Sequence, residues 1–300
     1  MNLKTGALLS VVVAAGLAVW LWPGVSRVTV RPLPDPPHPA RPPTTASAPA
    51  TAPQWPSTRE RPALPPLRYR GIAFQVQTNY RVLETFTPVL DEIAALGADT
   101  VLIATAGWME HARSQALVIE QRKTPSREDF VALIRAARAR GLQVMLMPMV
   151  LLSHPRGTEW RGMIEPPDGP RWWRDYRDFV LYFADIANEG QATALLVGSE
   201  LVRAETATDE WVQIIAAVRE RYHGQVGYSA NWDSYEKVQF WDRLDFIGMT
   251  SYFKLVEHEQ PTVAELIERW RPIHASVVAW QKQLGRPIVL TEVGWCSQVG

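Results

Sequence analysis

Cysteine is nearly absent from this 300-residue chain, in which Cys296 is the only one. A single thiol excludes an internal disulfide, and six scattered histidines add no metal-binding pattern. The sequence lacks CxxC and HExxH motifs, and it lacks the glycine-rich motifs GxGxxG and GxxxxGK(S/T) that cradle phosphates. The formal net charge is zero, so the composition does not indicate electrostatic binding of nucleic acid. We therefore expect no cofactor, no metal and no nucleic-acid partner.

Charge is also missing near the N-terminus, where no charged residue lies between Lys4 and Arg27. The stretch 7–22 is almost wholly apolar, as in a signal peptide or a membrane-spanning anchor. No small-x-small cleavage site follows it, and the tryptophans at its end suit a membrane–water interface. We predict a signal-anchor over residues 1–30, with cleavage and secretion as the alternative. Either reading places the rest of the chain outside the cytoplasm, in the periplasm or at the cell surface.

Proline is concentrated in one segment, because 13 of the 24 prolines lie between Arg31 and Pro66. Proline removes backbone donors and fixes φ, so such a segment does not form a packed core. We predict a disordered linker over residues 31–67 that joins the membrane segment to a folded domain over residues 68–300.

From residue 71 onward, short apolar runs alternate with segments of helical periodicity. Clear boundary signals include Ser126-x-x-Asp129, a capping box, and Gly141, a helix C-cap. The predicted strands are 71–77, 100–105, 143–150, 193–200, 225–232, 245–253 and 287–292, and the predicted helices are 85–96, 126–140, 173–188, 209–222 and 263–284.

Alternation of apolar strands with helices indicates a parallel sheet covered by helices. A doubly wound sheet would alternate in the same way, but here chemically interesting residues recur at strand ends and not in one glycine-rich turn. We therefore predict an α/β fold of the (β/α)8 TIM-barrel type. Typical lengths of β/α units leave no room for an eighth strand and helix before Gly300, so we expect the eighth unit to be missing from this chain.

Two glutamates close two of the predicted strands: Glu200 ends the fourth and Glu292 ends the seventh. In a parallel β/α barrel, the carboxyl ends of the strands form the face on which active sites are built. Two carboxyl groups that face each other across one barrel mouth are typical of a glycosidase. One protonates the leaving oxygen, and the other stabilises the oxocarbenium-like centre. If they stand ~5–5.5 Å apart, the second attacks directly and the configuration is retained.

Tryptophan is abundant, with 13 residues in the chain. The flat C–H face of a pyranose ring stacks on aromatic planes, so tryptophans beside a cleft suit glycan binding. For any single tryptophan, core packing is the better explanation of its presence. Those near predicted strand ends or in loops are Trp108, Trp160, Trp172, Trp173, Trp232 and Trp295.

Six short segments follow one another in a characteristic order. They are Trp160-Arg-Gly-Met-Ile-Glu-Pro166, Val197-Gly-Ser-Glu200, Tyr228-Ser-Ala-Asn-Trp-Asp233, Phe240-Trp-Asp-Arg-Leu-Asp-Phe-Ile-Gly248, Ser251-Tyr-Phe253 and Thr291-Glu-Val-Gly-Trp295. In this order the sequence resembles glycoside hydrolase family 113 over roughly residues 70–300. Members of that family are β-mannanase-like enzymes of clan A, the large clan of retaining β/α-barrel glycosidases.

The resemblance implies a role for each matching residue. Glu200 would be the acid/base and Glu292 the nucleophile, and the Tyr252 hydroxyl would hydrogen-bond the nucleophile. Together with Tyr252, the residues that would contact or line the substrate cleft are Trp160, Arg161, Asn231, Trp232 and Trp295. The implied activity is retaining hydrolysis of a β-linked polysaccharide such as β-1,4-mannan.

These roles set requirements on the two carboxyl groups. Glu200 must be protonated when the cycle starts, so its pKa is expected to be raised by a second carboxylate and an apolar wall. Glu292 must stay ionised, and a donor such as the Tyr252 hydroxyl is expected to hold it so.

Two other functions stay open at this stage. A non-catalytic, membrane-tethered glycan-binding module would keep the barrel without turnover, and an envelope assembly protein would use tether and barrel for protein partners. The presence of both glutamates favours the enzyme. The expected partners are therefore a polysaccharide or oligosaccharide substrate and, through the N-terminal segment, a membrane.

Overall fold

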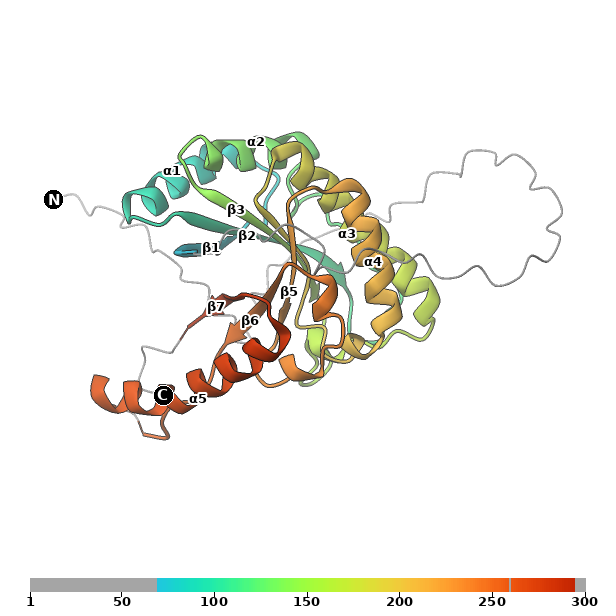
Figure 1. Cartoon of the computed structure of the whole chain (residues 1–300). Coiled ribbons are helices and arrows are strands. Elements are labelled where there is room, and N and C mark those ends of the chain that lie inside the picture. The colour runs from blue at the N-terminus through green and yellow to red at the C-terminus, as the bar shows by residue number, and fades with distance from the viewer. Residues whose placement is uncertain (1–68, 259, 295–300) are drawn as a thin grey trace, which may run out of the picture.

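The computed structural model describes residues 69–258 and 260–294, in which strands and helices alternate (Figure 1). The strands are β1 (Gly71–Gln75), β2 (Thr100–Met109), β3 (Gln143–Leu152), β4 (Ala194–Ser199), β5 (Gln225–Ala230), β6 (Phe246–Ser251) and β7 (Ile288–Val293). The α-helices are α1 (Val82–Ala95), α2 (Arg127–Arg138), α3 (Gly169–Gly190), α4 (Thr208–Arg221) and α5 (Val263–Leu284). Short 3-10 turns are η2 (Arg161–Met163), η3 (Ala204–Thr206), η4 (Tyr235–Lys237) and η5 (Trp241–Arg243).

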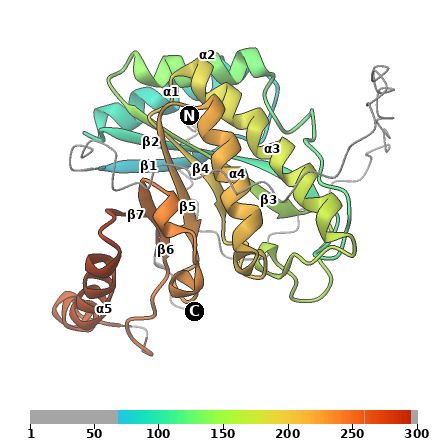
Figure 2. The same cartoon turned by 45° about the vertical axis from the view of Figure 1, so that its right-hand side comes forward.

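All seven strands form one parallel sheet in sequence order, from β1 to β7. Strands β4 and β6 are buried along their whole length, which explains their nearly continuous small and apolar sequences. Helices α1 to α4 pack against one another on the outside of the curved sheet (Figures 1 and 2). Helix α5 lies apart from them, outside β6 and β7, and buries only Val277.

The helices begin and end where their local chemistry allows. The Ser126 hydroxyl accepts from the Asp129 backbone N–H at 3.1 Å, which confirms the predicted N-cap of α2. Asp168 caps α3 in the same way through the Arg171 N–H at 3.0 Å, so this helix starts four residues before the predicted Trp173. Strands β2 and β3 run past their predicted ends because they continue to pair with each other as far as Met109 and Leu152.

The core has two parts, one on each face of the sheet. Between strands and helices, aromatic side chains pack edge to face; Trp172 is 1% exposed and stacks on Tyr176 with ring centroids 5.0 Å apart. Trp172 is therefore a core residue, not part of a glycan cleft, and Trp173 packs edge-on against it. Inside the barrel, a smaller cluster consists of Leu102, Ala104, Met145, Met147, Met149, Ala194, Leu196 and Phe246.

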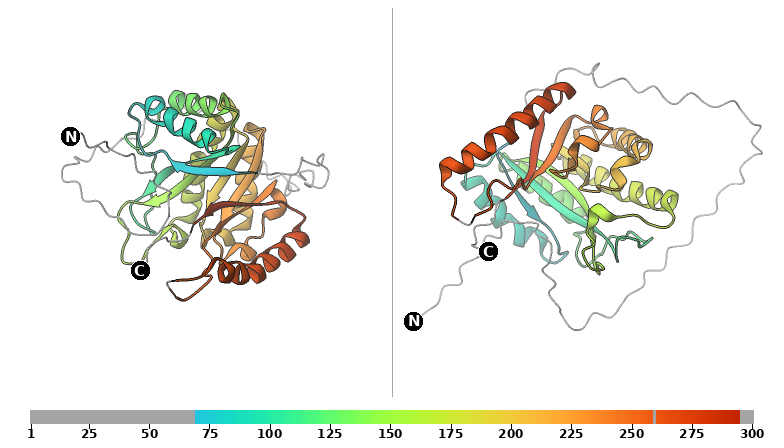
Figure 3. Two further views of the ribbon diagram at one scale, coloured as in Figure 1. Left: turned by 90° about the vertical axis from the view of Figure 1, so that its left-hand side faces the viewer. Right: turned by 90° about the horizontal axis from the view of Figure 1, so that it is seen from below.

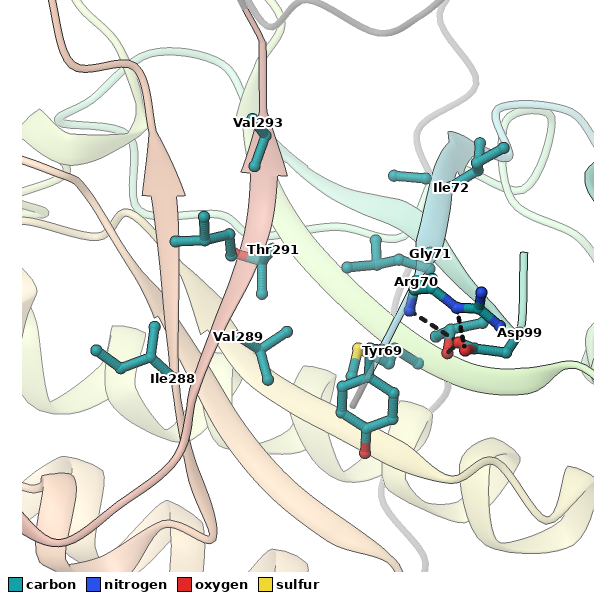
Figure 4. Close-up of a pocket in the computed structure, with 14 residues that line it drawn as sticks. Tyr69, Arg70, Gly71, Ile72, Asp99, Ile288, Val289, Thr291 and Val293 are labelled. Carbon is teal, nitrogen blue, oxygen red and sulfur yellow. Dashed lines mark hydrogen bonds and ion pairs between the residues drawn. The ribbon is translucent and has the colours of Figure 1, made fainter. Parts of the chain in front are cut away.

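The two ends of the sheet, β1 and β7, face each other across a gap (Figure 3). A cavity of about 950 Å³ occupies this gap, and Figure 4 shows Gly71 and Ile72 on one wall and Val289 and Thr291 on the other. In a complete eight-stranded barrel, one further strand would pair with both edges here. The predicted TIM-barrel fold is confirmed, and the described residues contribute seven of its strands.

The predicted signal-anchor and linker, residues 1–30 and 31–67, lie outside the described residues. Among the helices that the structure describes, none has the length and the hydropathy needed to cross a membrane. Membrane attachment through the N-terminal segment stays a prediction.

Candidate active site

The predicted site residues gather at the carboxyl ends of the strands. Glu200 directly follows β4, Asn231 follows β5, Tyr252 follows β6, and Glu292 is the penultimate residue of β7. Arg161 opens the η2 turn in the connection after β3. The catalytic face of a β/α barrel is built from the same positions.

Each glutamate lies next to an irregularity in the strand pairing. The β4–β5 register shifts between Leu196 and Ser199, just before Glu200. On β7, Leu290 and Glu292 pair with the adjacent residues Met249 and Thr250, so the strand carries an extra residue between them. Regular alternation would send Glu292 to the same side as Leu290, which lines an apolar pocket under α5. A bulge re-aims side chains, so here it allows Glu292 to reach the barrel mouth.

Arg161 joins the two glutamates. Its Nη2 atom lies 2.5 Å from Oε2 of Glu200 and 3.9 Å from Oε1 of Glu292. These two carboxylate oxygens cannot be farther apart than the sum of the two distances. The three side chains are nearly buried, with exposed fractions of 11% for Arg161, 9% for Glu200 and 13% for Glu292. The glutamates therefore share one enclosed site.

Glu292 is held from two further directions. The Tyr252 hydroxyl donates to Oε2 of Glu292 at 2.9 Å, as the family resemblance implied. Burial nevertheless raises the pKa of Glu292, and the neighbouring Glu200 adds to this rise, while the Arg161 charge and the Tyr252 hydrogen bond act against it. The Tyr252 hydroxyl thus favours the ionised form of Glu292 as expected, but desolvation outweighs it and leaves the pKa above its ordinary value.

The remaining predicted residues lie around this centre with defined structural contacts. Oδ1 of Asn231 accepts from the Trp232 N–H at 3.0 Å and from the Thr250 hydroxyl at 3.2 Å, so it ties the end of β5 to β6. The Trp232 ring packs edge-on against Phe253.

Trp160 is 37% exposed and covers the turn that carries Arg161. A Cβ atom added at Gly162 would lie 2.4 Å from its ring, so only glycine permits this approach. Trp295 lies outside the described residues.

Sequence reasoning assigned Arg161 to substrate contacts and missed its bridge between the glutamates. Arg161 is 39 residues from Glu200, and no local pattern relates them. Sequence reasoning also missed Glu205, a fully buried carboxyl group five residues after Glu200. Within the described residues, no group of three or more His, Cys, Asp or Glu side chains could hold a metal ion.

Comparison with known proteins gives a consistent result. The sequence matches the profile of Glycoside Hydrolase Family 113 over residues 74–300. Among solved structures, the chain is similar to a GH113 β-mannanase from Alicyclobacillus acidocaldarius in complex with ManMIm, at 29% identity and a TM-score of 0.67, covering 77% of this chain and 72% of that one. It is similar to a GH113 β-1,4-mannanase at 26% identity, also with a TM-score of 0.67, covering 77% and 74%. No curated protein matches the chain.

Proposed function

Because the chain belongs to glycoside hydrolase family 113, and so is a glycosidase, we propose that it hydrolyses β-1,4-linked mannan with retention of configuration. The observation that carries this proposal is the shared contact of Arg161 with Glu200 and Glu292. The upper limit it sets on the separation of their oxygens lies just under ~6.5 Å, where the spacing of inverting glycosidases begins. A closely spaced pair favours direct attack by one carboxylate.

Glu200 and Glu292 divide the reaction between them. The Glu292 carboxylate attacks the anomeric carbon while Glu200 gives its proton to the departing glycosidic oxygen, and a glycosyl-enzyme ester forms. Glu200, now ionised, then takes a proton from water as that water attacks the same carbon and frees Glu292. Two inversions at one carbon yield net retention.

Arg161 and Tyr252 serve the nucleophile in this scheme. Attack requires the ionised form of Glu292, and burial works against that form. The Arg161 guanidinium and the Tyr252 hydroxyl offset part of this cost. Both stay next to Glu292 while its negative charge is lost as the ester forms. The Arg161–Glu200 contact has to open before Glu200 can approach a leaving oxygen, so substrate entry and this contact compete.

The preference for mannan rests on the solved structures to which the chain is similar, two of which are named as β-mannanases of family 113. The family resemblance would imply polar residues near the end of β3, where this chain has Met147-Pro148-Met149. Met147 and Met149 are buried inside the barrel, so they present an apolar floor and no hydrogen-bonding group. We therefore expect the protein to make fewer hydrogen bonds to the sugar hydroxyls on that side of the site.

The test is hydrolysis of β-1,4-mannan, followed by the release of reducing ends. The wild-type protein should release them, and Glu200→Gln should lower kcat by about 10²- to 10⁴-fold, the usual contribution of a general acid. Proton NMR of the first product formed should show the β-anomer before mutarotation.

Initial release of the α-anomer would contradict retention. Binding of mannan without any hydrolysis would contradict the enzymatic proposal and support a glycan-binding module. Hydrolysis of another β-glycan but not of mannan would leave the mechanism intact and overturn the substrate.

A further inference from the structure

Glu200 has an unusual backbone conformation. Its φ is 52°, in the left-handed region that is strained for a non-glycine residue. Two other described non-glycine residues share this conformation, and both flank helices: Arg81 precedes α1 and Gln191 follows α3. Glu200 has no helix terminus to explain it. Such a conformation persists only where the surroundings over-determine it.

Both peptide groups that flank the Glu200 Cα atom are held by β5. The N–H of Glu200 donates to the Ser229 carbonyl at 2.8 Å, and the N–H of Leu201 donates to the Tyr228 hydroxyl at 2.9 Å. The first bond fixes the peptide before the Cα atom and the second fixes the peptide after it. The second is made by a side chain, so its strength depends on how that hydroxyl is oriented.

Tyr228 is oriented by Glu205. Its hydroxyl donates to Oε1 of Glu205 at 2.9 Å. A phenol has one hydrogen, so directing it to Glu205 leaves the oxygen lone pair for the Leu201 N–H. The Tyr228 ring cannot shift to another partner, because it is fully buried against Trp211 and Phe240 with ring centroids 5.0 and 5.3 Å away.

The turn that carries Glu205 is itself fixed. The Glu205 N–H donates to the Leu201 carbonyl at 2.9 Å, and the Trp211 indole donates to the carbonyl of Ala204 at 2.9 Å. The Ser234 hydroxyl approaches the second carboxyl oxygen of Glu205 at 3.4 Å. The carboxyl group is thus built into a closed network that begins and ends beside Glu200.

A carboxyl group in this place is costly. Burial raises the pKa of Glu205 to about 7; the Tyr228 and Ser234 hydrogen bonds lower it, Glu200 raises it, and Lys237 lowers it. Burial disfavours the ionised form of this carboxyl group, and strongly shifted pKa values of this kind cluster at functional sites.

We infer that Glu205 and Tyr228 are positioning residues for Glu200: Glu205 orients the Tyr228 hydroxyl, which holds the Leu201 peptide and so keeps Glu200 in the strained conformation that points its carboxyl group into the site. This inference rests on the proposed role of Glu200 as acid/base. Both side chains are fully buried and out of reach of a substrate, so they act only through the geometry of Glu200.

The test compares two substrates in the full chain. Mannopentaose has a poor leaving group and needs the proton of Glu200, whereas 2,4-dinitrophenyl β-mannobioside has a leaving group that departs without one. Tyr228→Phe and Glu205→Met should lower kcat/KM for mannopentaose by about 10- to 100-fold, as expected for a misplaced catalytic group. For the dinitrophenyl substrate, whose kcat/KM reports only the first step, they should leave kcat/KM unchanged.

Two controls separate positioning from general destabilisation. Glu205→Gln keeps an oxygen that accepts from Tyr228, so it should retain wild-type activity on both substrates. Tyr222→Phe removes another buried tyrosine hydroxyl, one that donates to the Ala192 carbonyl at 2.8 Å before β4 begins. It should lower the melting temperature as Tyr228→Phe does, without changing the ratio of kcat/KM between the two substrates.

Equal losses on both substrates, or a Tyr228→Phe variant that behaves like Tyr222→Phe, would overturn the positioning role while leaving the enzyme assignment intact. A wild-type protein inactive on both substrates would overturn the proposed function and this inference with it.

Discussion

At the scale of single residues, neighbouring groups in the site have opposing effects on the pKa of Glu292. Burial and Glu200 raise its pKa, whereas Arg161 and Tyr252 lower it. Arg161 is the larger of the two lowering influences, and it also contacts Glu200. Its contribution can be separated experimentally, because a charge and a hydrogen bond can be removed one at a time.

Arg161→Gln removes the positive charge beside Glu292. The pKa of Glu292 should then rise further, and since attack needs the ionised carboxylate, the acid limb of the kcat/KM profile should move to higher pH. Tyr252→Phe should move it in the same direction by less. Arg203→Gln, which removes an exposed arginine paired with Glu165, is the matched control and should leave the limb in place. An acid limb unchanged in Arg161→Gln would remove Arg161 from this role.

Glu292→Ala removes the proposed nucleophile and would leave a space beside the anomeric carbon. We expect activity on mannan to disappear and azide to restore turnover of an activated aryl β-mannoside, because the small anion can attack from the vacated side. The product should be the α-glycosyl azide, identified by NMR. Undiminished activity without azide would exclude Glu292 as the nucleophile.

Glu205→Gln tests how much the buried carboxyl group of Glu205 lowers the stability of the fold when it is ionised. The folded-state pKa of Glu205 is raised from 4.5 to about 7, so the folded protein holds this proton more tightly than the unfolded chain does. Wild-type stability should therefore fall as pH rises through this window, and the glutamine variant should lack that loss. Melting temperatures measured from pH 4 to 8 should show the variant gaining on the wild type, whereas the exposed Glu220→Gln should not gain.

At the scale of elements, the site depends on how β4 and β7 depart from regular pairing. Both irregularities lie within the last residues before a glutamate. On β4, aromatic side chains of α3, α4 and β5 press against the strand at Gly198, where a Cβ atom would lie 2.6 Å from the Tyr176 hydroxyl and 2.9 Å from the Tyr228 ring. A glycine is required there because the aromatic layer that positions Tyr228 leaves no room for a methyl group.

Gly198→Ala should therefore disturb both stability and activity. Overpacking of this kind costs about 1–3 kcal/mol, and each kcal/mol lowers the melting temperature of a domain this size by about 2–4 °C. Displacement of Tyr228 should lower kcat as well. Gly169→Ala, at the first residue of α3 with open space around it, is the control and should leave both unchanged. A Gly198→Ala variant as stable as wild type would contradict the packing argument.

At the scale of the whole molecule, the parallel sheet brings residues from strand β7 and from the connections after β3, β4, β5 and β6 to one mouth, while its two edges stay apart. The cavity between β1 and β7 opens into the barrel interior beside Leu102 and Met145. The gap between these two strands therefore leaves the inner cluster uncovered on one side. Unpaired parallel edges also offer backbone groups to other chains. Glu200 and Glu292 are less affected, because β4 lies in the middle of the sheet and β7 is paired to β6 along its length.

The domain boundary predicted at residue 68 has its own test. Deletion of residues 1–67 should leave kcat/KM on soluble mannan unchanged, because a proline-rich segment adds no packed core. It should also move the protein from the membrane to the soluble fraction. A variant that lacks only residues 31–67 should stay with the membrane, and a full-length protein found entirely in the soluble fraction would exclude the anchor.

The sequence by itself determined the order of the elements, most of their bounds, the barrel class and the two glutamates, since periodicity, caps such as Ser126 and strand-end position are local properties. It also indicated Tyr252 as the partner of Glu292, through the family resemblance. Only the tertiary structure decided that Arg161 bridges both glutamates, that Glu205 reaches Tyr228 across 23 residues, and that desolvation dominates the Glu292 pKa. These features depend on register shifts and on which side chains exclude water, and both are settled when distant strands close around a common axis.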